Sequence, residues 1–421
     1  MTIIERTYMG VHCMGTTSLT RLIGHDPRIE MFKALRDSGH LPFFREMQSA
    51  TAPTMSVEGR QMTMLGSNNY LGLSTHPAVV EGAARALREF GTATTGSRLM
   101  NGTIDLHLRI EAELAQWHGT EDAIVFTTGY QTNLGTIGAL VPPGGPVVVD
   151  QYAHASIQDG CRLAGADLRR FRHNDMGSLR AALTELGSVV PVLVIIDGLY
   201  SMEGDFAPLT EVQELCDDFG AVLMVDEAHS VGLFGDRGTG VSEMAGLADR
   251  VPVRMGSLSK GLASTGGFVA GTRDLIDTIR GRARAFQFST AGVPSTLGAA
   301  LAAIQLARSD EGRALAAQSA ENARFLRSEL QARGVDVGSD PSVAGLSPSP
   351  IVPVYVGDDL RVIEAWRTLF DDGIYCNAAV HPAVPAGNAL LRVCVMATHT
   401  AEQLEFAADA IAQSLDVTAA A

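Results

Sequence analysis

The sequence predicts an α/β protein, with a large domain built on a mostly parallel sheet covered by helices and a smaller α+β domain after it. Three observations support this fold class: apolar runs alternate with helical stretches from about residue 77, the runs are bounded by Gly, Asp or Pro, and the order of elements changes after residue 334. Continuous apolar runs are typical of strands buried on both faces of a parallel sheet. Their alternation with helices indicates an α/β architecture.

The elements of the larger domain follow from periodicity. Helices are predicted at 78–91, 105–119, 133–141 and 291–307. Strands are predicted at 123–129, 146–150, 192–198, 221–229 and 251–257. The stretch 291–307 contains Pro, Ser, Thr and Gln and is shorter than a membrane span, so a buried helix is expected and no membrane role is indicated.

A smaller domain is predicted after a long helix at 311–334. The β-α-β-β-α order comes from 351–357, 360–373, 374–380, 390–397 and 401–415. Before the larger domain, 57–65 is typical of a short hairpin, and the stretch 32–47 predicts a helix and an arm. The chain is therefore divided into an N-terminal arm, helix and hairpin (1–60), a large domain (61–305) and a small C-terminal domain (306–421).

Composition and charge exclude several functional classes. The chain has 421 residues, 46% of them hydrophobic and 19% charged, as in a well-packed protein. Its formal charge of −15 argues against a general nucleic-acid binder. Five scattered cysteines without a CxxC pair, and an N-terminus without an apolar signal run, favour a reducing, cytoplasmic setting.

One lysine stands in an unusual stretch, MGSLSKGLASTGGF. Lys260 is the only charged residue between Met255 and Phe268. One interpretation is a lysine that ends a buried strand. The alternative is a lysine in a pocket of small residues, where lost solvation lowers the pKa of the amine and makes it a nucleophile.

The strand predicted at 221–229 ends in polar groups, as ligand sites in open α/β sheets do. Asp226 could pair with a protonated ring nitrogen and make an attached ring an electron sink, or it could cap the next helix. Asp226 and His229 have the spacing D-x-x-H, but no convincing third ligand follows, so no metal site is predicted.

Other strand ends add groups of the same kind. Thr128, Gly129 and Tyr130 lie in a glycine turn that enters a helix, where backbone amides could bind phosphate. His154 follows another strand and is either structural or stacked on a planar cofactor. Ser201 lies beyond a further strand, in DGLYSMEGD. A lysine that forms an imine, an acid for a ring nitrogen, a stacking histidine and a phosphate cradle together describe a pyridoxal phosphate (PLP) site.

Seven motifs carry a family resemblance: SNNYLGL, GTATTGSRLMNGT, HASIQDGCR, DGLYSMEGDFAPL, VDEAHSVGLFG, GSLSKGLASTGGF and LLRVCVMATHT. In this order, over about residues 40 to 415, the chain resembles the α-oxoamine synthase family. TTGSRLMNGT, FRHND and VDEAHS are most similar to its soluble bacterial serine palmitoyltransferase branch. Glycine C-acetyltransferase and 8-amino-7-oxononanoate synthase are further members. The resemblance implies a fold-type-I PLP-dependent enzyme that forms a homodimer with shared active sites.

The resemblance also implies roles for matched residues. Lys260 would form the imine with the cofactor and later move protons, Asp226 would pair with the pyridine nitrogen, His229 would contact the ring hydroxyl, and His154 would stack on the ring. The phosphate would be held by Gly129, Tyr130, Ser257 and Ser259, helped by Ser289 or Thr290 of the other subunit. The pocket would also contain Asn68, Ser201 and the carboxylate-binding Arg392.

The implied reaction condenses a small amino acid (serine, glycine or alanine) with an acyl-CoA or an acyl carrier protein, usually with loss of carbon dioxide, to give an α-oxoamine. Val380 stands where soluble serine palmitoyltransferases carry an arginine near the substrate carboxylate, which leaves the amino acid and the acyl group open. Basic stretches at 161–173 and 280–286 could bind nucleotide phosphates or be solvated helix faces. Two alternatives are an aminotransferase of the same fold and a non-catalytic subunit, although the latter usually loses the lysine.

Overall fold

The computed structural model describes residues 22, 24, 26–187, 191–339 and 348–416. They form two compact units, which divide between residues 44 and 45 and are described separately. In the first unit, α2 (Pro27–Asp37) begins with a proline at its first turn and with Asp26 as N-cap, whose side chain accepts the backbone N–H of Arg28. This helix confirms the element expected within 32–47 but begins five residues earlier, because the cap and proline lie upstream of the apolar stretch.

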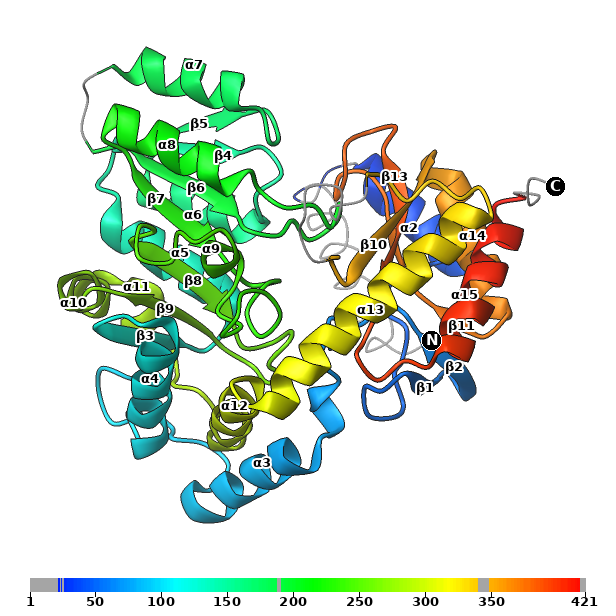
Figure 1. Cartoon of the computed structure of the whole chain (residues 1–421), viewed down its shortest axis with the longest axis horizontal. Helices are drawn as coiled ribbons and strands as arrows, with labels where there is room; N and C mark the ends of the chain where they lie inside the picture. Colours follow the sequence, from blue (N-terminus) through cyan, green and yellow to red (C-terminus); the bar gives the residue numbers. More distant parts are fainter. Residues whose placement is uncertain (1–21, 23, 25, 188–190, 340–347, 417–421) are drawn as a thin grey trace, which may run out of the picture. The chain divides into compact units, whose positions relative to one another are not determined.

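A seven-stranded sheet forms the centre of the larger part of the second unit (Figure 1). Its strand order is β3-β9-β8-β7-β6-β4-β5, and β9 alone runs antiparallel to its neighbours. The strands are β3 (Asp122–Phe126), β4 (Pro146–Asp150), β5 (Asp167–Phe171), β6 (Leu193–Asp197), β7 (Val222–Asp226), β8 (Val253–Ser257) and β9 (Gly267–Gly271). The mostly parallel sheet predicted from the apolar runs is confirmed.

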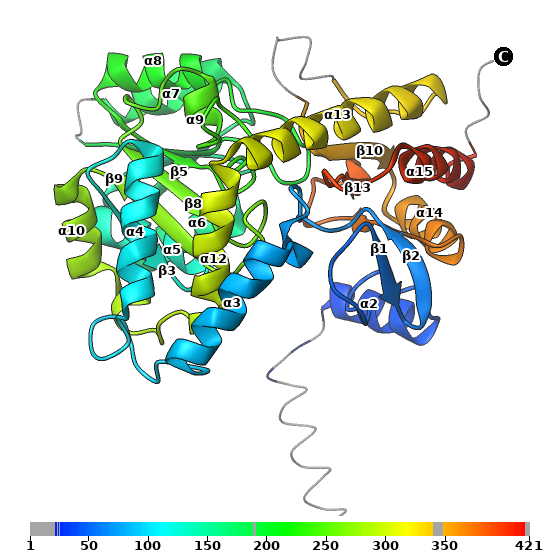
Figure 2. The ribbon, with the colours of Figure 1, turned by 60° about the horizontal axis from the view of Figure 1, so that its bottom comes forward.

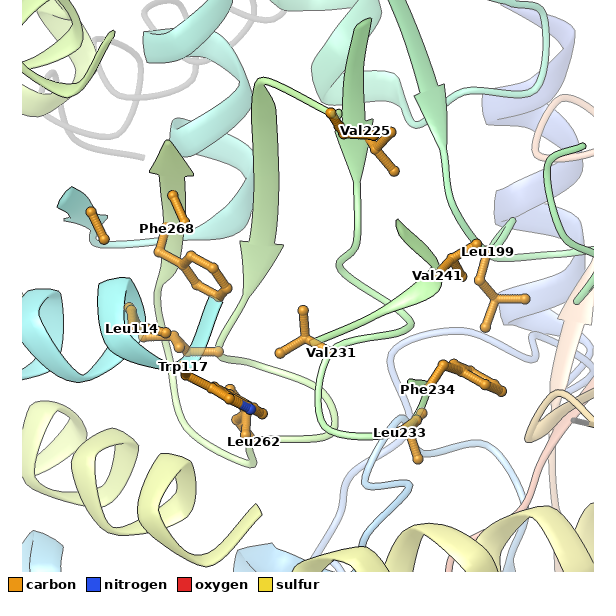
Figure 3. Close-up of a cluster of buried hydrophobic side chains, with 14 of the residues drawn as sticks. Leu114, Trp117, Leu199, Val225, Val231, Leu233, Phe234, Val241, Leu262 and Phe268 are labelled. Carbon is orange, nitrogen blue, oxygen red and sulfur yellow. The ribbon is translucent and has the colours of Figure 1, made fainter. Parts of the chain in front are cut away.

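Helices cover both faces of this sheet, because successive side chains of a buried strand point in opposite directions. In β4, for example, Val148 packs into one core while Val147 and Val149 pack into the other. One face is covered by α5 (Gly129–Leu140), α6 (Ala155–Ala164), α10 (Arg273–Arg282) and α11 (Arg284–Gln287). The other is covered by α3 (Pro77–Phe90), α4 (Asp105–His118), α7 (Met176–Leu186), α8 (Leu209–Phe219) and α12 (Pro294–Ala307). Figure 3 shows part of the core on this latter face, where Trp117, Val231 and Phe268 lie among leucines and valines.

Strand register brings chemically useful groups to one edge. Asp197, the last residue of β6, lies opposite Asp226, the last residue of β7. Asp226 in turn lies opposite Met255 in β8, two residues before that strand ends. The chain beyond β8 carries Lys260. Three neighbouring strands therefore deliver two acids and a lysine to the same carboxyl edge of the sheet.

A second core lies in the C-terminal part, to which α13 (Asp310–Ala332) runs from α12 (Figures 1 and 2). One small sheet has the order β10-β13-β12, and another has the order β1-β2-β11. Their strands are β1 (Thr54–Val57), β2 (Arg60–Met64), β10 (Ile351–Gly357), β11 (Ile374–Tyr375), β12 (Asn377–Ala379) and β13 (Ala389–Cys394). The remaining elements are η1 (Leu73–Thr75), α9 (Val241–Met244), α14 (Asp359–Asp371) and α15 (Ala401–Ser414).

The single strand expected at 374–380 was wrong. The chain changes sheets at Cys376, so β11 pairs with β2 of the hairpin and β12 pairs with β13. The amide of Asn377 donates to the carbonyl of Gly66 at 2.7 Å and holds this crossing in place. The hairpin thus shares a sheet with a C-terminal strand, which periodicity could not reveal. The predicted boundaries after residues 60 and 305 stay a prediction.

Two strands were not predicted. β5 reads DLRRF and is half-exposed because it lies at the edge of the sheet, where β4 is its one partner strand. β9 contains two glycines and lacks an apolar run of the usual length. Within the described residues, no helix is both long enough and apolar enough to cross a bilayer.

Candidate active site

A cavity of about 250 Å³ lies at the carboxyl edge of β6, β7 and β8. Eight predicted site residues line it: Gly129, Tyr130, His154, Asp226, His229, Ser257, Ser259 and Lys260. Its wall also contains Thr128 of the predicted phosphate-binding turn and Asp197 at the end of β6. The sequence interpretation did not assign the other lining residues to the site: Asn133, Ser156, Leu199, Ala228 and Met255. Groups from separate strand ends therefore meet in one cavity.

Lys260 lies three residues beyond β8, in a turn that is closed by the Ala263 N–H donating to the Lys260 carbonyl at 2.8 Å. Ala263 has a φ of 46°, in the left-handed region that residues with a Cβ seldom adopt. Burial lowers the pKa of the Lys260 amine, and the carboxylates of Asp226 and Asp197 only partly oppose this. The interpretation of Lys260 as a lysine inside a pocket is therefore the one that the geometry supports.

Asp226 is held by two donors. Its Oδ1 accepts the Ala228 N–H at 2.9 Å, and its Oδ2 accepts the side-chain amide of Asn133 at 2.8 Å. The same amide nitrogen donates to Ser156 Oγ at 2.9 Å, while Asn133 Oδ1 is buried without a hydrogen-bond partner. Asn133 and Asp226 are 1% and 4% exposed, so the carboxylate is oriented in a nearly dry environment. Asn133 lies on α5, 93 residues from Asp226, and no local signal pointed to it.

His154 is the N-cap of α6, and its Nδ1 accepts the backbone N–H of Ser156. Ser156 Oγ lies 2.7 Å from the same nitrogen, so a neutral His154 carries its proton on Nε2. Desolvation lowers the pKa of His154 even though part of the ring is exposed in the cavity. Asp197 accepts the His154 backbone N–H at 3.3 Å. Burial and the nearby Asp226 charge raise the pKa of Asp197 well above its ordinary value.

A cradle of donors closes the other side of the cavity. Thr128 caps α5 by accepting the Gln131 N–H at 3.1 Å, which leaves the amides of Gly129 and Tyr130 in the first turn. A Cβ on Gly267 would lie 2.7 Å from the Cα of Gly129, so glycine at this position lets β9 approach the start of α5.

Two hydroxyl groups complete this cradle. Ser257 Oγ and Ser259 Oγ lie 2.7 Å apart, and both residues line the same cavity. Helix-terminal amides combined with hydroxyls are suited to a phosphate.

Arg392 lies close by and joins the remaining predicted residues. Its Nε donates to the backbone carbonyl of Ser201, and its Nη2 donates to the hydroxyl of Tyr70 at 3.4 Å. That hydroxyl also lies 3.1 Å from Asn68 Oδ1 and 2.8 Å from His229 Nδ1. Tyr70 thus connects Asn68, His229 and Arg392, although the sequence interpretation did not single it out. Ser201 takes part in this network through its backbone carbonyl, which accepts the hydrogen bond from Arg392 Nε.

Five predicted residues do not line the cavity within one chain: Asn68, Ser201 and Arg392, which belong to the Tyr70 network, and Ser289 and Thr290, which do not. Ser289 and Thr290 line a separate cavity of about 10 Å³, and Ser289 Oγ accepts the Gln131 amide at 3.2 Å. Their predicted role from the other subunit stays a prediction.

The FRHND motif forms a cluster beside the cavity. His173 Nδ1 lies 3.1 Å from Asp150 Oδ1, and its Nε2 lies 2.9 Å from Asp205 Oδ2. Burial alone would lower the pKa of His173, but these two hydrogen bonds raise it to about 10. Tyr152 stacks on the imidazole with 4.4 Å between ring centroids. His173 is therefore an imidazolium that ties the ends of β4 and β5 to the loop after β6.

The two basic stretches differ in how much of their charge is paired. In 161–173, Arg162 pairs with Asp159 and Arg172 with Asp175, while Arg169 pairs with Asp167 and Glu185. In 280–286, Arg280 pairs with Asp277 and Asp122, whereas Arg282 and Arg284 form no ion pair among the described residues. Internal pairing therefore favours a solvated face for the first stretch, and both interpretations stay open for the second.

The sequence and the fold match known proteins over nearly the whole chain. A family model described as aminotransferase class I and II matches residues 60–411. A serine palmitoyltransferase from Sphingobacterium spiritivorum is 37% identical over 396 residues, which cover 94% of this chain and 96% of that protein. An 8-amino-7-oxononanoate synthase from Citrifermentans bemidjiense is 39% identical and covers 91% of this chain and 97% of that protein.

A solved structure shows the same similarity. A serine palmitoyltransferase variant from S. paucimobilis, with bound PLP-myriocin aldimine, has a TM-score of 0.88 and 36% identity over 92% of this chain and 96% of that chain. Similarity at this level extends to the whole fold and not to one motif. The chain therefore belongs to the α-oxoamine synthase family, the PLP-dependent acyltransferases of fold type I.

Proposed function

We propose that the chain binds PLP in the 250 Å³ cavity and condenses a small amino acid with an acyl thioester to give an α-oxoamine. The observation that carries the proposal is the convergence of Lys260, Asp226 and the Tyr70-linked Arg392 from separate strands around one site. An amine, a carboxylate and a guanidinium are the groups that such a condensation needs for proton transfer, for a ring nitrogen and for a substrate carboxylate.

The residues present fit the cofactor. Asp226 is nearly dry and oriented by two donors, as a partner of a protonated ring nitrogen needs to be. The α5 amides and the hydroxyls of Ser257 and Ser259 fit a phosphate. When bound, PLP withdraws electrons from the α-carbon of the amino acid attached to it.

The side chains then have separate tasks. Lys260 takes a proton from the α-carbon and returns it, which a lowered amine pKa favours near neutral pH. His154 lies along one wall of the cavity, where its ring can cover a planar ligand. Arg392 is 5% exposed, and its planar guanidinium is suited to a carboxylate.

The amino-acid substrate is proposed to be glycine, alanine or serine. Val380 is packed with the apolar cluster of the C-terminal part, so this position offers no second cation to the substrate carboxylate. Arg392 is then the residue that we assign to this carboxylate. Acyl-CoA and an acyl carrier protein are both compatible with the surface arginines of the two basic stretches, and the assay must separate them.

A homodimer with shared sites is also proposed. Ser97 and Thr290 form an isolated β-bridge, and exposed apolar side chains lie within three residues of this pair: Leu99, Met100, Phe288 and Val293. Exposed apolar side chains grouped in this way are typical of protein interfaces. A second copy seated here would bring Thr290 to the boundary between subunits, as the family resemblance implies.

The chain has only two lysines, Lys33 and Lys260, which makes a direct test possible. After PLP is added, borohydride reduction followed by peptide mass analysis should place the label on Lys260 and not on Lys33. The visible band should shift with one of glycine, alanine or serine, and Lys260→Ala should abolish it. Lys33→Ala is the matched control, because Lys33 is exposed and paired with Glu30. Label on neither lysine would reject the cofactor site.

The acyltransferase and the aminotransferase differ in products. With the best amino acid and an acyl-CoA, free thiol should be released only when both substrates are present. Transfer of the amino group to a 2-oxo acid without thiol release would support the aminotransferase alternative instead. A parallel assay with acyl carrier protein distinguishes the two thioester carriers.

A further inference from the structure

The hydroxyl of Tyr70 has three polar neighbours, although the residue is 0% exposed. Asn68 Oδ1 lies at 3.1 Å, His229 Nδ1 at 2.8 Å and Arg392 Nη2 at 3.4 Å. A tyrosine hydroxyl has one proton to donate and two lone pairs to accept with. The identities of the three neighbours therefore limit how the protons can be distributed.

Two of the neighbours have fixed roles. A guanidinium can only donate, so Arg392 uses one acceptor position of the hydroxyl. A carbonyl oxygen can only accept, so Asn68 takes the single Tyr70 proton. His229 is then left with one option: its Nδ1 must carry a proton and donate it to Tyr70.

The neighbouring thiol supports the orientation of the Asn68 amide. Cys394 Sγ lies 4.0 Å from Asn68 Oδ1 as a weak donor, so the oxygen of this amide faces two donors, a thiol and a hydroxyl. Burial and the nearby cations lower the pKa of His229 well below its ordinary value. His229 is thus neutral and has one proton to place.

We propose that Tyr70 is a positioning residue that, together with Asn68, holds His229 as its Nδ1–H tautomer. His229 lines the cavity, and its Nε2 has no hydrogen-bond partner among the described residues. In this tautomer Nε2 presents a lone pair. The ligand atom that meets it must therefore be a donor such as a hydroxyl, and a bare anionic oxygen is disfavoured.

The backbone around Tyr70 is built to keep the hydroxyl in place. The Tyr70 carbonyl accepts the Ala397 N–H at 2.8 Å, so the segment is tied to the chain after β13. Gly72 has a φ of +74°, and a Cβ there would lie 2.6 Å from Thr398 Cγ2. This close approach joins the SNNYLGL motif to the MATHT end of the LLRVCVMATHT motif.

The test is NMR of the ring nitrogens in PLP-loaded protein labelled with ¹⁵N-histidine, with His229→Gln used to assign the signal. Wild type should show His229 protonated on Nδ1. Asn68→Ala releases the Tyr70 proton, and Tyr70→Phe removes the acceptor for Nδ1–H. Both should therefore move the proton population toward Nε2. Tyr375→Phe, at another buried tyrosine whose hydroxyl is absent from this network, should leave the tautomer unchanged.

The proposal would be overturned by a wild-type protein in which His229 carries its proton on Nε2. It would also be overturned by an Asn68→Ala protein in which the His229 proton stays on Nδ1. A circular dichroism spectrum shows whether each variant is folded, and Asn68→Ser supplies a milder change if Asn68→Ala is not. The tautomer stands independently of the reaction, whereas its consequence for the ligand rests on the proposed function.

The consequence is tested by binding. Tyr70→Phe should weaken amino-acid binding to the PLP-loaded protein about tenfold with a smaller change in kcat, because Arg392 loses one acceptor that fixes it. An equal fall in kcat and unchanged binding would contradict this consequence. Wild-type protein that shows the Nδ1 tautomer yet binds no amino acid would instead count against the proposed function.

Discussion

Histidines in two neighbouring regions have pKa values that are shifted in opposite directions. In the corner formed by β4, β5 and the loop after β6, His173 meets two carboxylates, and its pKa is raised to about 10. In the adjacent cavity, desolvation dominates and the pKa values of His154 and His229 are lowered. All three rings lie beyond ends of strands of the same sheet. Burial lowers the pKa of all three imidazoles, and at His173 the hydrogen bonds to two carboxylates outweigh it.

The difference separates two tasks. The corner keeps a permanent cation whose purpose is to join three strand ends, including the loop whose Ser201 carbonyl accepts a hydrogen bond from Arg392. The cavity lowers the pKa values of its imidazoles and of the Lys260 amine, so that Lys260 can accept a proton from the substrate and return it. The following substitutions and pH measurements test this difference between the corner and the cavity.

Lys260→Ala should have the largest effect, because it removes the one amine of the cavity. We expect kcat to fall by about 10³-fold or more, as for loss of a general base. Thiol release from the acyl thioester measures it, with Lys33→Ala expected to match wild type. Activity of Lys260→Ala within tenfold of wild type would contradict the assigned role.

His173→Gln should break the corner and leave the cavity's own side chains intact. Removing one partner of a buried ion pair leaves Asp150 uncompensated at 0% exposure, so unfolding free energy should drop by about 3 kcal/mol. Urea denaturation at pH 7 measures the loss.

The pH dependence of the free energy of unfolding tests whether the stabilisation by His173 comes from its charged form. Since the folded pKa of His173 is raised to about 10, its stabilisation is complete below the unfolded value near 6.5 and is lost as pH rises through 10. Wild type should therefore lose stability between pH 7 and 10 more steeply than His173→Gln. Parallel curves for the two proteins would show that His173 is not an imidazolium.

Asp226→Asn should change the pKa values inside the cavity and leave the His173 corner unchanged. The Asp226 charge raises the pKa of both His154 and Lys260, so its removal should lower both further. Loss of the carboxylate that faces the ring nitrogen should reduce kcat by about 100-fold. Steady-state rates from pH 6 to 10 test this, and the acid limb, along which a general base loses activity as it is protonated, should lie at a higher pH in wild type than in Asp226→Asn.

His154→Gln should have the smallest effect on stability, and of the opposite sign to that of His173. The folded pKa of His154 is lowered, so the unfolded chain binds the proton first and stability falls as pH drops below about 6.5. Since part of the ring is exposed, His154→Gln should remove less than about 1 kcal/mol of this acid-side loss. Urea denaturation between pH 8 and 5 gives the comparison. A steeper acid-side loss in the variant would be inconsistent with a neutral His154.

Local sequence was enough to predict the strand ends and the groups they carry. Apolar runs and the small-residue setting of Lys260 are local signals, and parallel strands place their carboxyl ends at one edge. The eight predicted residues that line the cavity follow from that rule together with the family resemblance. The edge strand β5 and the glycine-containing β9 were not predicted, because neither has the apolar run of a central strand.

The sequence by itself thus determined the α/β class, most of the central strands, and the lysine, acids and glycine turn at strand ends, because these depend on nearest neighbours along the chain. The tertiary structure alone decided that Asn133 orients Asp226, that Tyr70 joins Asn68, His229 and Arg392, and that two acids hold His173 as a cation. These contacts join residues far apart in sequence. Hydrogen bonding and pKa depend on distances through space, which periodicity does not contain.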